Sequence, residues 1–339
     1  MYSFLNDYSE GAHPRIMDAL MQTNMIQTVG YGEDEYCQKA RDVMKKRMHR
    51  DDADIHFLVG GTQTNMAFLT HVLRDYEAVI ATDEGHIHVH ETGAVEFTGH
   101  KVLTIPHVSG KITVAGIDEL LSHFGECHMV KPRVVYISQT TELGTYYTKK
   151  ELEDLYDYTQ KHDLYLFVDG ARLGSAIVLE DAPSLEELVH LCDSFYIGGT
   201  KMGLLFGEAL VILHPALQSD FRFTMKQKGA MLAKGRLLGI QFYEVFKDEL
   251  YEEIGAHENA LAMRIQKAFM DIGAKVYLPS STNQIFVDVS QELLDYIEKE
   301  YMVTHIGKFG DLTRIRLVTS FATKEETVED FVGYLHIFQ

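Results

Sequence analysis

The sequence predicts an α/β fold, in which helices cover both faces of a mostly parallel sheet and a smaller α+β domain follows. Short apolar runs alternate with stretches of helical periodicity over most of the chain. The runs are apolar throughout, as in strands buried on both faces. After Lys234 the alternation gives way to one long helical stretch and further strands. We therefore expect an N-terminal arm plus a large domain over residues 1–245, and a small C-terminal domain over 246–339.

The N-terminal part of the chain leads into the first strand of the sheet. Residues 1–13 are polar and rich in turn formers, which predicts an extended arm. Two helices follow, one over 14–21 with proline at its start and one capped by Asp34. A buried strand over 55–59 then leads into a helix that ends at about Leu73.

The alternation continues from there to residue 213. We expect strands at 78–82, 101–106, 133–138, 164–168, 193–197 and 209–213, with helices at 86–98, 117–124, 148–162 and 183–191. Thr148-Lys-Lys-Glu151 forms a capping box at the start of one of these helices. In the C-terminal part we expect a helix over 237–269 broken around Gly255, strands at 274–277, 283–289, 302–305 and 314–319, and helices near 291–300 and from Lys324.

Composition restricts the partners and the compartment. The 339 residues carry a formal net charge of -19, whereas nucleic acids and anionic membrane surfaces require a basic face. The three cysteines form no CxxC pair, and the N-terminus has neither a basic leader nor a long apolar run. We expect a cytoplasmic protein without nucleic-acid or membrane partners.

Four positions lie at or just past the carboxyl ends of predicted strands, and they suggest one shared site. They are Gly60, Ser138, Asp169 and Lys201. In a parallel sheet, ligands bind outside the carboxyl ends of the strands. The four positions are therefore expected to lie together.

Lys201 and Asp169 are the most informative of these positions. A lysine in a tight Gly-Gly-Thr-Lys-Met-Gly turn is partly desolvated, which leaves a free amine able to form a Schiff base. A buried carboxylate at Asp169 would keep a pyridine nitrogen protonated. Taken singly, Lys201 also fits a solvated surface lysine, and Asp169 also fits a helix cap or an ion pair with Arg172.

Gly60-Gly-Thr-Gln63 joins a strand to a helix and predicts an anion site. Backbone N–H groups at the positive end of a helix bind phosphate. The spacing matches neither a P-loop nor GxGxxG, so a plain turn is the alternative.

Three alternating histidines invite a metal interpretation. On a strand His86, His88 and His90 would share one face, whereas on a helix only His86 and His90 would. A transition metal needs a further converging ligand, and the adjacent Glu91 points elsewhere in either geometry. We expect no metal, and a metal-dependent hydrolase built on these histidines is a remote alternative.

Arg314 and Arg316 are two residues apart on a late strand and share a face. One of them is suited to clamp a carboxylate bidentately. An arginine in an edge-strand salt bridge is the alternative.

In this order along one α/β chain, the motifs resemble the threonine aldolase/β-eliminating lyase family of pyridoxal 5'-phosphate enzymes. The similarity covers essentially the whole chain and is carried by Asn6-Asp7, Tyr31-Gly32, Gly61-Thr-Gln-x-Asn65, His86 with Glu91 and Gly93, Val168-Asp-Gly-Ala-Arg172, Thr200-Lys201 and Arg316-Leu-Val-Thr319. The resemblance implies the aspartate-aminotransferase fold with its seven-stranded sheet, and pyridoxal phosphate as cofactor. It also implies a homodimer or homotetramer whose active sites are shared between subunits.

The resemblance further implies roles for single residues. Lys201 looks like the lysine that binds the cofactor covalently, Asp169 like the partner of its ring nitrogen, and His86 like the residue stacked on its ring. The expected phosphate contacts are Gly60, Gly61, Thr62, Gln63 and Thr200. Arg172 and Arg316 look like the clamp for the substrate carboxylate, and Arg172 also counts among the cofactor contacts. Asn6 stands where the family often has a serine that assists the clamp, and Tyr31 is a further expected substrate contact.

Two departures from the family pattern stand out. Glu142 stands where the family commonly has a histidine that acts on the substrate's β-hydroxyl, and a carboxylate can also accept that proton. The family's arginine donated to the partner's phosphate falls within 226–236, where Lys228, Lys234 or Arg236 would replace it.

The sequence thus favours a lyase that cleaves the Cα–Cβ bond of a β-hydroxy-α-amino acid, with threonine giving glycine and acetaldehyde. Another β-elimination or a transamination on the same fold is the alternative, and a non-catalytic protein that keeps the fold is a further one.

Overall fold

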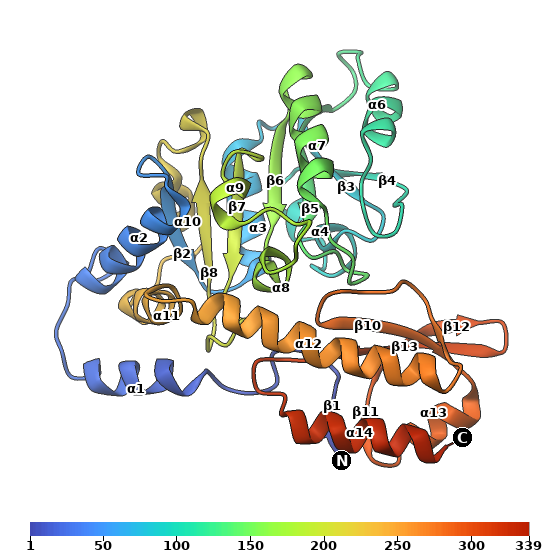
Figure 1. Cartoon of the computed structure of the whole chain (residues 1–339). Helices are drawn as coiled ribbons and strands as arrows, with labels where there is room; N and C mark the ends of the chain where they lie inside the picture. The colour runs from blue at the N-terminus through green and yellow to red at the C-terminus, as the bar shows by residue number, and fades with distance from the viewer. Residues whose placement is uncertain (339) are drawn as a thin grey trace.

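The computed structural model describes residues 1–338 and is built around one large sheet (Figure 1). Its strands lie in the order β2 (Asp54–Leu58), β8 (Glu208–Ile212), β7 (Ser194–Gly198), β6 (Tyr165–Asp169), β5 (Lys131–Ser138), β3 (Glu77–Thr82) and β4 (Lys101–Ile105). β8 is antiparallel to both neighbours, and all other neighbouring strands are parallel. The predicted seven-stranded, mostly parallel sheet is confirmed.

Successive residues of the central strands pack into two different cores. In β6, Leu166 and Val168 belong to one core and Phe167 to the other, because side chains alternate across a strand. The first core is covered by α1 (Pro14–Thr23), α2 (Glu35–Met48), α6 (Val114–Ser122), α7 (Lys149–Lys161), α8 (Leu173–Ile177), α9 (Leu185–Leu188) and α11 (Arg236–Phe246). The second is covered by α3 (Gly61–Val72), α4 (His86–Val89), α5 (Ala94–Phe97), the 3₁₀ helix η1 (Pro215–Leu217) and α10 (Phe221–Gln227). Helices therefore cover both faces of the sheet, as predicted.

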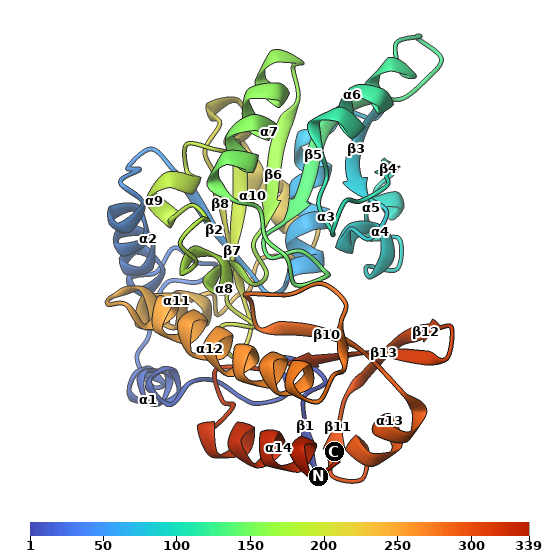
Figure 2. The ribbon, with the colours of Figure 1, turned by 45° about the vertical axis from the view of Figure 1, so that its right-hand side comes forward.

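The C-terminal part has its own hydrophobic cluster and lies below the large sheet in Figures 1 and 2. Its elements are α12 (Leu250–Asp271), β9 (Lys275–Val276), β10 (Gln284–Val289), α13 (Gln291–Ile297), β11 (Tyr301–Met302), β12 (Thr304–Phe309), β13 (Leu312–Val318) and α14 (Glu325–Ile337). A four-stranded antiparallel sheet has the order β12-β13-β10-β9. The arm begins here too, because β1 (Tyr2–Ser3) pairs with β11. A domain division at residues 245 and 246 stays a proposal.

Two predicted helices differ from those observed. The helix expected over 86–98 is interrupted, because Thr92 and Gly93 adopt left-handed backbone conformations with φ of 54° and 73°. The break expected around Gly255 is wrong, since the chain breaks between Phe246 and Leu250 and Gly255 lies inside α12. A Cβ atom on Gly255 would lie 2.1 Å from the carbonyl oxygen of Gly174 in α8. The glycine thus permits close packing of the two helices.

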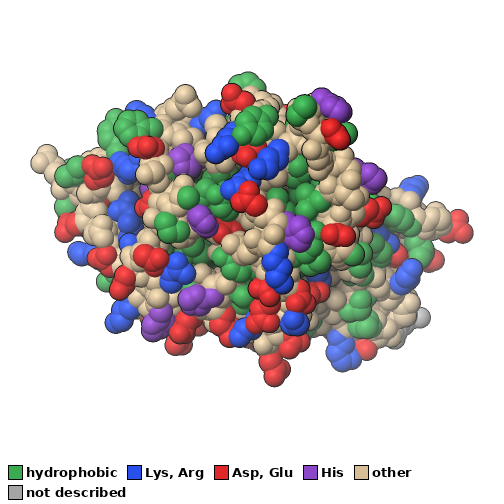
Figure 3. Space-filling view, turned by 90° about the horizontal axis from the view of Figure 1, so that it is seen from above, with side chains coloured by type: hydrophobic (Ala, Val, Ile, Leu, Met, Phe, Trp, Pro, Cys, Tyr) green, Lys and Arg blue, Asp and Glu red, His purple; other side chains and the backbone are tan. Residues whose placement is uncertain are grey.

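Acidic and basic side chains are interspersed over the face shown in Figure 3. Within residues 1–338, no helix combines the length and the apolar character that crossing a bilayer requires.

Gly255→Ala is expected to lower the free energy of unfolding by about 1–3 kcal/mol, because the added methyl group overpacks the contact between α12 and α8. Gly333→Ala in α14 is the matched control, since a Cβ there meets no atom within 4 Å. This control is expected to gain up to about 1 kcal/mol, because alanine favours a helix over glycine. Urea denaturation of both variants measures the difference, and equal stabilities would contradict the packing argument.

Candidate active site

Asp169 lies at the carboxyl end of β6 and accepts four hydrogen bonds. Its Oδ1 accepts from the Tyr196 hydroxyl and from the backbone N–H of Ala171 at 3.1 Å. Its Oδ2 accepts from the Tyr136 hydroxyl at 2.5 Å and from Asn65 Nδ2 at 3.0 Å. The carboxylate is only 3% exposed, so these donors replace its hydration. The alternative of an ion pair between Asp169 and Arg172 is wrong.

Lys201 lies in the turn after β7, close enough for its charge to interact with that of Asp169. Its ammonium is 5.9 Å from the ring centre of Tyr8. Burial lowers the pKa of the Lys201 amine, and the positive charge of Arg172 lowers it further. The solvated surface lysine is therefore not what the structure shows, and a larger share of the amine is unprotonated than in water.

His86 begins α4 and is held by a chain of buried polar groups. Its Nδ1 lies 2.8 Å from Glu91 Oε1, which also accepts from Asn65 Nδ2 at 2.8 Å. Asn65 thereby links Glu91 to Asp169. Burial opposes protonation of His86, but the hydrogen bond to Glu91 and the negative charges of Asp169 and Glu91 outweigh it, so the pKa of His86 is raised. The expectation that Glu91 points away from His86 is wrong, because the backbone turn after α4 brings its carboxylate back to the ring. Neither Asn65 nor Glu91 was expected in the site, although both stand in the motifs that carry the family resemblance.

The Gly60–Gln63 turn opens α3 directly after β2. Gly60 is the N-cap residue, and a Cβ on Gly61 would come within 2.8 Å of the Tyr196 hydroxyl. The first N–H groups of this 12-residue helix have no partner within the helix. Thr62 is exposed, and Gln63 accepts from the N–H of Val59 through its side chain at 3.3 Å. The turn therefore offers backbone donors and a bare Cα, as an anion site requires.

Thr200 lies beside Lys201, and its hydroxyl makes two hydrogen bonds. Its Oγ1 donates to Glu208 Oε1 at 2.9 Å and accepts from the N–H of Gly207 at 3.0 Å. Glu208 Oε2 accepts from the N–H of Gly199 at 3.0 Å. A buried carboxylate from β8 thus fastens the turn that carries Lys201.

Arg172 is held by Asp7 from the N-terminal arm. Its Nε donates to Asp7 Oδ2 at 2.6 Å and one terminal nitrogen donates to Oδ1 at 3.1 Å. Burial works to raise the pKa of Asp7, but the charges of Arg172 and Lys201 prevail and lower it. Asp7 also accepts from Asn283 Nδ2 at 2.9 Å. The ion pair therefore joins the N-terminal arm to the turn that follows β6. Asn283, the residue before β10, is attached to the same carboxylate.

The two arginines of β13 have different surroundings. Arg314 donates to both carboxylate oxygens of Asp288, at 2.7 and 3.1 Å, and so takes the salt-bridge alternative. Arg316 has a buried Nε without a hydrogen-bond partner, and one terminal nitrogen donates to the carbonyl of Leu5 at 3.3 Å. Burial lowers the pKa of Arg316, and the nearby charge of Arg172 lowers it further. Two partly buried cations whose charges interact, one of them with an unused donor, suit an anionic ligand.

Glu142 follows β5 and contacts the start of α4. Its Oε1 accepts from Ser138 Oγ at 2.5 Å and from the backbone N–H of His86 at 3.0 Å. Burial raises the pKa of the Glu142 carboxyl, although the Ser138 hydrogen bond opposes the shift. The structure thus brings Glu142 to the same cluster as His86.

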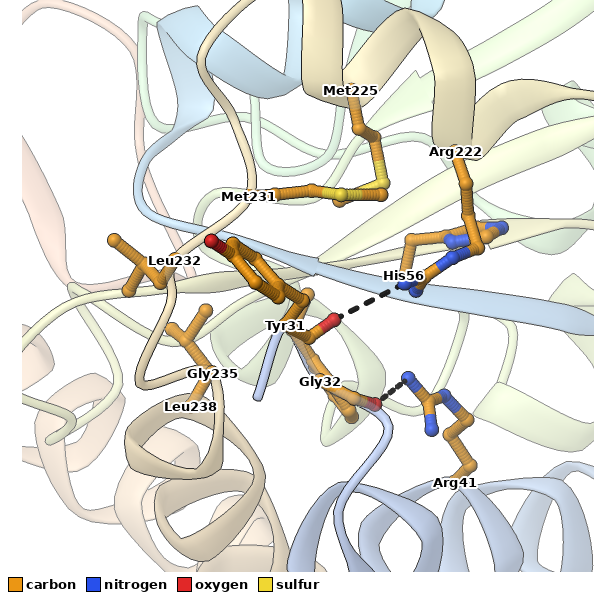
Figure 4. A pocket seen from close by; sticks show the side chains of 11 residues that line it. Tyr31, Gly32, Arg41, His56, Arg222, Met225, Met231, Leu232, Gly235 and Leu238 are labelled. Carbon is orange, nitrogen blue, oxygen red and sulfur yellow. Dashed lines mark hydrogen bonds between the residues drawn. The ribbon is translucent and has the colours of Figure 1, made fainter. Parts of the chain in front are cut away.

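Asn6 and Tyr31 are engaged outside this cluster. Asn6 Oδ1 closes a turn by accepting from the N–H of Tyr8 at 2.9 Å and from Ser9 Oγ at 3.0 Å. Tyr31 lies in the pocket of Figure 4, where its carbonyl accepts from Arg222 at 3.3 Å. Their contacts with a substrate stay predictions.

Part of the segment 226–236 lines the pocket of Figure 4. The guanidinium of Arg236 donates to the carbonyls of Ile26 and Thr23, and the Lys226 ammonium lies 4.5 Å from the Tyr31 ring centre. Arg236 is therefore hydrogen-bonded within its own subunit, and a contact of Lys228, Lys234 or Arg236 with a partner's phosphate stays a prediction.

The structure contradicts a three-histidine metal site. α4 is a helix on which His88 is exposed, and only the rings of His86 and His90 approach each other, at 5.6 Å between centres. Among the described residues, the ligand atoms that gather within 4.8 Å belong to His86, Glu91 and Asp169. Hydrogen bonds already join these three groups directly or through Asn65.

Known proteins share this architecture over the full chain. A family model described as β-eliminating lyase matches residues 4–303. A low-specificity L-threonine aldolase from Pseudomonas sp. (strain NCIMB 10558) is 30% identical over 336 residues, covering 97% of this chain and 96% of that protein. A structure of Leishmania major threonine aldolase matches with a TM-score of 0.98 and 45% identity, covering 100% of this chain and 99% of that one. The aromatic aminotransferase from Pyrococcus horikoshii OT3 shares the fold, with a TM-score of 0.72 and 18% identity over 99% of this chain and 95% of that one.

These likenesses define the class as an α/β enzyme with an aminotransferase-like fold. Within that class, the chain belongs to the β-eliminating lyase family, and the predicted family resemblance is confirmed.

Glu91→Gln is expected to lower the pKa of His86, because it removes a charge and weakens the hydrogen bond to Nδ1. The raised pKa means that folding favours protonated His86. That stabilising contribution is complete below the ordinary histidine pKa and is lost as the pH rises through the raised value.

An NMR titration of the His86 ring protons measures the shift. Glu96→Gln, an exposed glutamate on α5, is the matched control and should leave the His86 titration nearly unchanged. Identical titrations in wild type and Glu91→Gln would show that Glu91 does not set the charge of His86.

Proposed function

We propose that this protein is a pyridoxal-phosphate-dependent lyase that cleaves threonine, a β-hydroxy-α-amino acid, to glycine and acetaldehyde. The observation that carries the proposal is half-buried Lys201, whose amine has a pKa lowered by burial and interacts with the charges of Asp169 and Arg172. An amine, a carboxylate and an arginine clamp are the groups that an amino acid and a cationic pyridine ring require. The two threonine aldolases named above support the choice of substrate.

The residues present fit pyridoxal phosphate. Asp169 would hold the ring nitrogen, Lys201 would bind the aldehyde carbon, and His86 would cover the ring. The absence of a Cβ on Gly61 lets the Tyr196 hydroxyl pack against the turn, the space beside the Cα of Gly60 is open, and the free N–H groups at the start of α3 would hold the phosphate. When bound, the cofactor supplies an electron sink for the electrons of the broken Cα–Cβ bond.

The substrate carboxylate is assigned to Arg172 and Arg316. Asp7 occupies the Nε edge of Arg172 and thereby fixes the direction of its guanidinium. Arg316 brings the unpartnered Nε, which a carboxylate oxygen would satisfy. Fixing the carboxylate sets which bond at Cα is aligned for cleavage.

Glu142 is assigned to the β-hydroxyl proton. Its raised pKa makes it a better proton acceptor than an ordinary carboxylate, and Ser138 and the N–H of His86 fix one of its oxygens. The second oxygen would accept the proton, directly or through one water.

A homodimer or homotetramer with shared sites is part of the proposal. Lys228 or Lys234 of a second copy would reach the phosphate. The proposal also includes a cytoplasmic location, which the three free cysteines support.

The purified protein is expected to absorb visible light after addition of pyridoxal phosphate, and to release acetaldehyde from threonine. Lys201→Arg keeps the positive charge but cannot bond the aldehyde, so it should lose the colour and at least about 10³-fold in rate. Absorption spectra and an acetaldehyde assay measure both effects.

A colourless wild type that pyridoxal phosphate does not change would overturn the cofactor. A coloured protein that releases pyruvate from serine but no acetaldehyde from threonine would replace cleavage of Cα–Cβ by elimination.

Glu142→Gln is expected to keep the colour and the KM for threonine, and to lose about 10²-fold in kcat, because only proton acceptance is removed. Ser138→Ala is the companion variant and should lower kcat less, since it removes a partner of Glu142 but not the carboxylate. An unchanged kcat in Glu142→Gln would move the base to another group.

A further inference from the structure

We propose that Glu208 is a positioning residue whose proton directs the Thr200 hydroxyl toward the cofactor's phosphate. The proposal rests on the proposed pyridoxal phosphate site and adds a residue to it.

Thr200 and Glu208 lie beside the phosphate turn. β2 and β8 are antiparallel neighbours. Glu208 of β8 pairs with Leu58 of β2, and Leu58 is two residues before Gly60 in the sequence. A Cβ on Gly207 would lie 3.5 Å from the carbonyl oxygen of Leu58. The Thr200 hydroxyl, which contacts both Gly207 and Glu208, is therefore at the edge where α3 begins.

The Thr200 hydroxyl has one proton and two lone pairs. One lone pair accepts from the N–H of Gly207. If Glu208 is ionised, the single proton must go to Glu208 Oε1, and none is left for a phosphate oxygen. The ionised carboxylate also sets a negative charge close to the anion site.

If Glu208 is protonated on Oε1, the hydrogen bond reverses. The acid then donates to the second lone pair of Thr200, and the Thr200 proton turns outward. Glu208 Oε2 still accepts from the N–H of Gly199, so every group keeps a partner. Only protonated Glu208 therefore leaves the Thr200 proton free to bind a phosphate oxygen, which is the role expected of Thr200.

The surroundings of Glu208 favour the protonated state at neutral pH. Burial raises the pKa of the Glu208 carboxyl to about 8, although the hydrogen bonds from Thr200 and Gly199 and the charge of Lys201 act against the shift. The negative charge of Asp169 adds to it. The hydroxyls of Tyr196 and Tyr251 also interact with the charge of Glu208, and both have pKa values raised well above the ordinary one and are therefore neutral.

The test measures binding of pyridoxine 5'-phosphate, which has no aldehyde and so does not bond to Lys201. Its phosphate is almost fully ionised above about pH 7. Wild type is expected to lose about tenfold more affinity than Glu208→Gln between about pH 7 and about pH 9.5. The glutamine amide donates to Thr200 at every pH, and its oxygen still accepts from Gly199.

Thr200→Val removes the hydroxyl and keeps the shape. It is expected to bind about tenfold more weakly than wild type at about pH 7, and to lose the part of the pH dependence that Glu208→Gln removes. Thr200→Ser keeps the hydroxyl and should retain the wild-type profile, which covers the case that the valine variant does not fold. Calorimetry gives the affinities and the protons exchanged on binding.

Equal pH profiles for wild type and Glu208→Gln would overturn the role of Glu208 while leaving the cofactor site intact. The same conclusion would follow if Thr200→Val bound as tightly as wild type. Absence of binding of both pyridoxine 5'-phosphate and pyridoxal phosphate at every pH would instead defeat the proposed cofactor, and this inference with it.

Discussion

The buried carboxylate of Asp169 is the constraint on which the site depends. A carboxylate this far from water is stable only with several donors, and its donors come from separate elements of the fold. Tyr136 comes from β5, Tyr196 from β7 and Asn65 from α3. The strand alternation that puts Phe167 in the second core also puts Asp169 on that side, where the two phenols lie. The packing of the sheet therefore also determines which donors surround Asp169.

A second set of charges fastens the outer parts of the molecule to this centre. Asp7, from the arm that starts beside β11, binds Arg172 and is held in turn by Asn283. Arg316 comes from β13 and has an unpartnered Nε. The place proposed for the substrate carboxylate is thus bounded by the arm, the large sheet and the C-terminal part. A relative movement of these parts would change the spacing of the two arginines.

Much of the fold follows from patterns that are local in the sequence. Continuous apolar runs predict the buried strands, and the Thr148–Glu151 capping box is present in the structure. The prediction of a helix break near Gly255 is wrong, because packing outweighs the low helix preference of glycine. The absence of a side chain at Gly255 permits close contact between α12 and Gly174 of α8. The helix over 86–98 is interrupted at Thr92 and Gly93, where a backbone turn brings Glu91 inward.

The sequence by itself determined the strand ends that carry Lys201 and Asp169, because strand periodicity and turn composition are properties of neighbouring residues. It also determined the family, through the order of motifs along the chain. Only the tertiary structure decided the partners of those residues, among them Asp7 for Arg172, Glu91 for His86 and Glu208 for Thr200. Asp7 and Arg172 are far apart in the chain, and a hydrogen bond over such a separation depends on how the sheet brings the elements together. The residues next to Asp7 and Arg172 in the sequence therefore do not determine this contact.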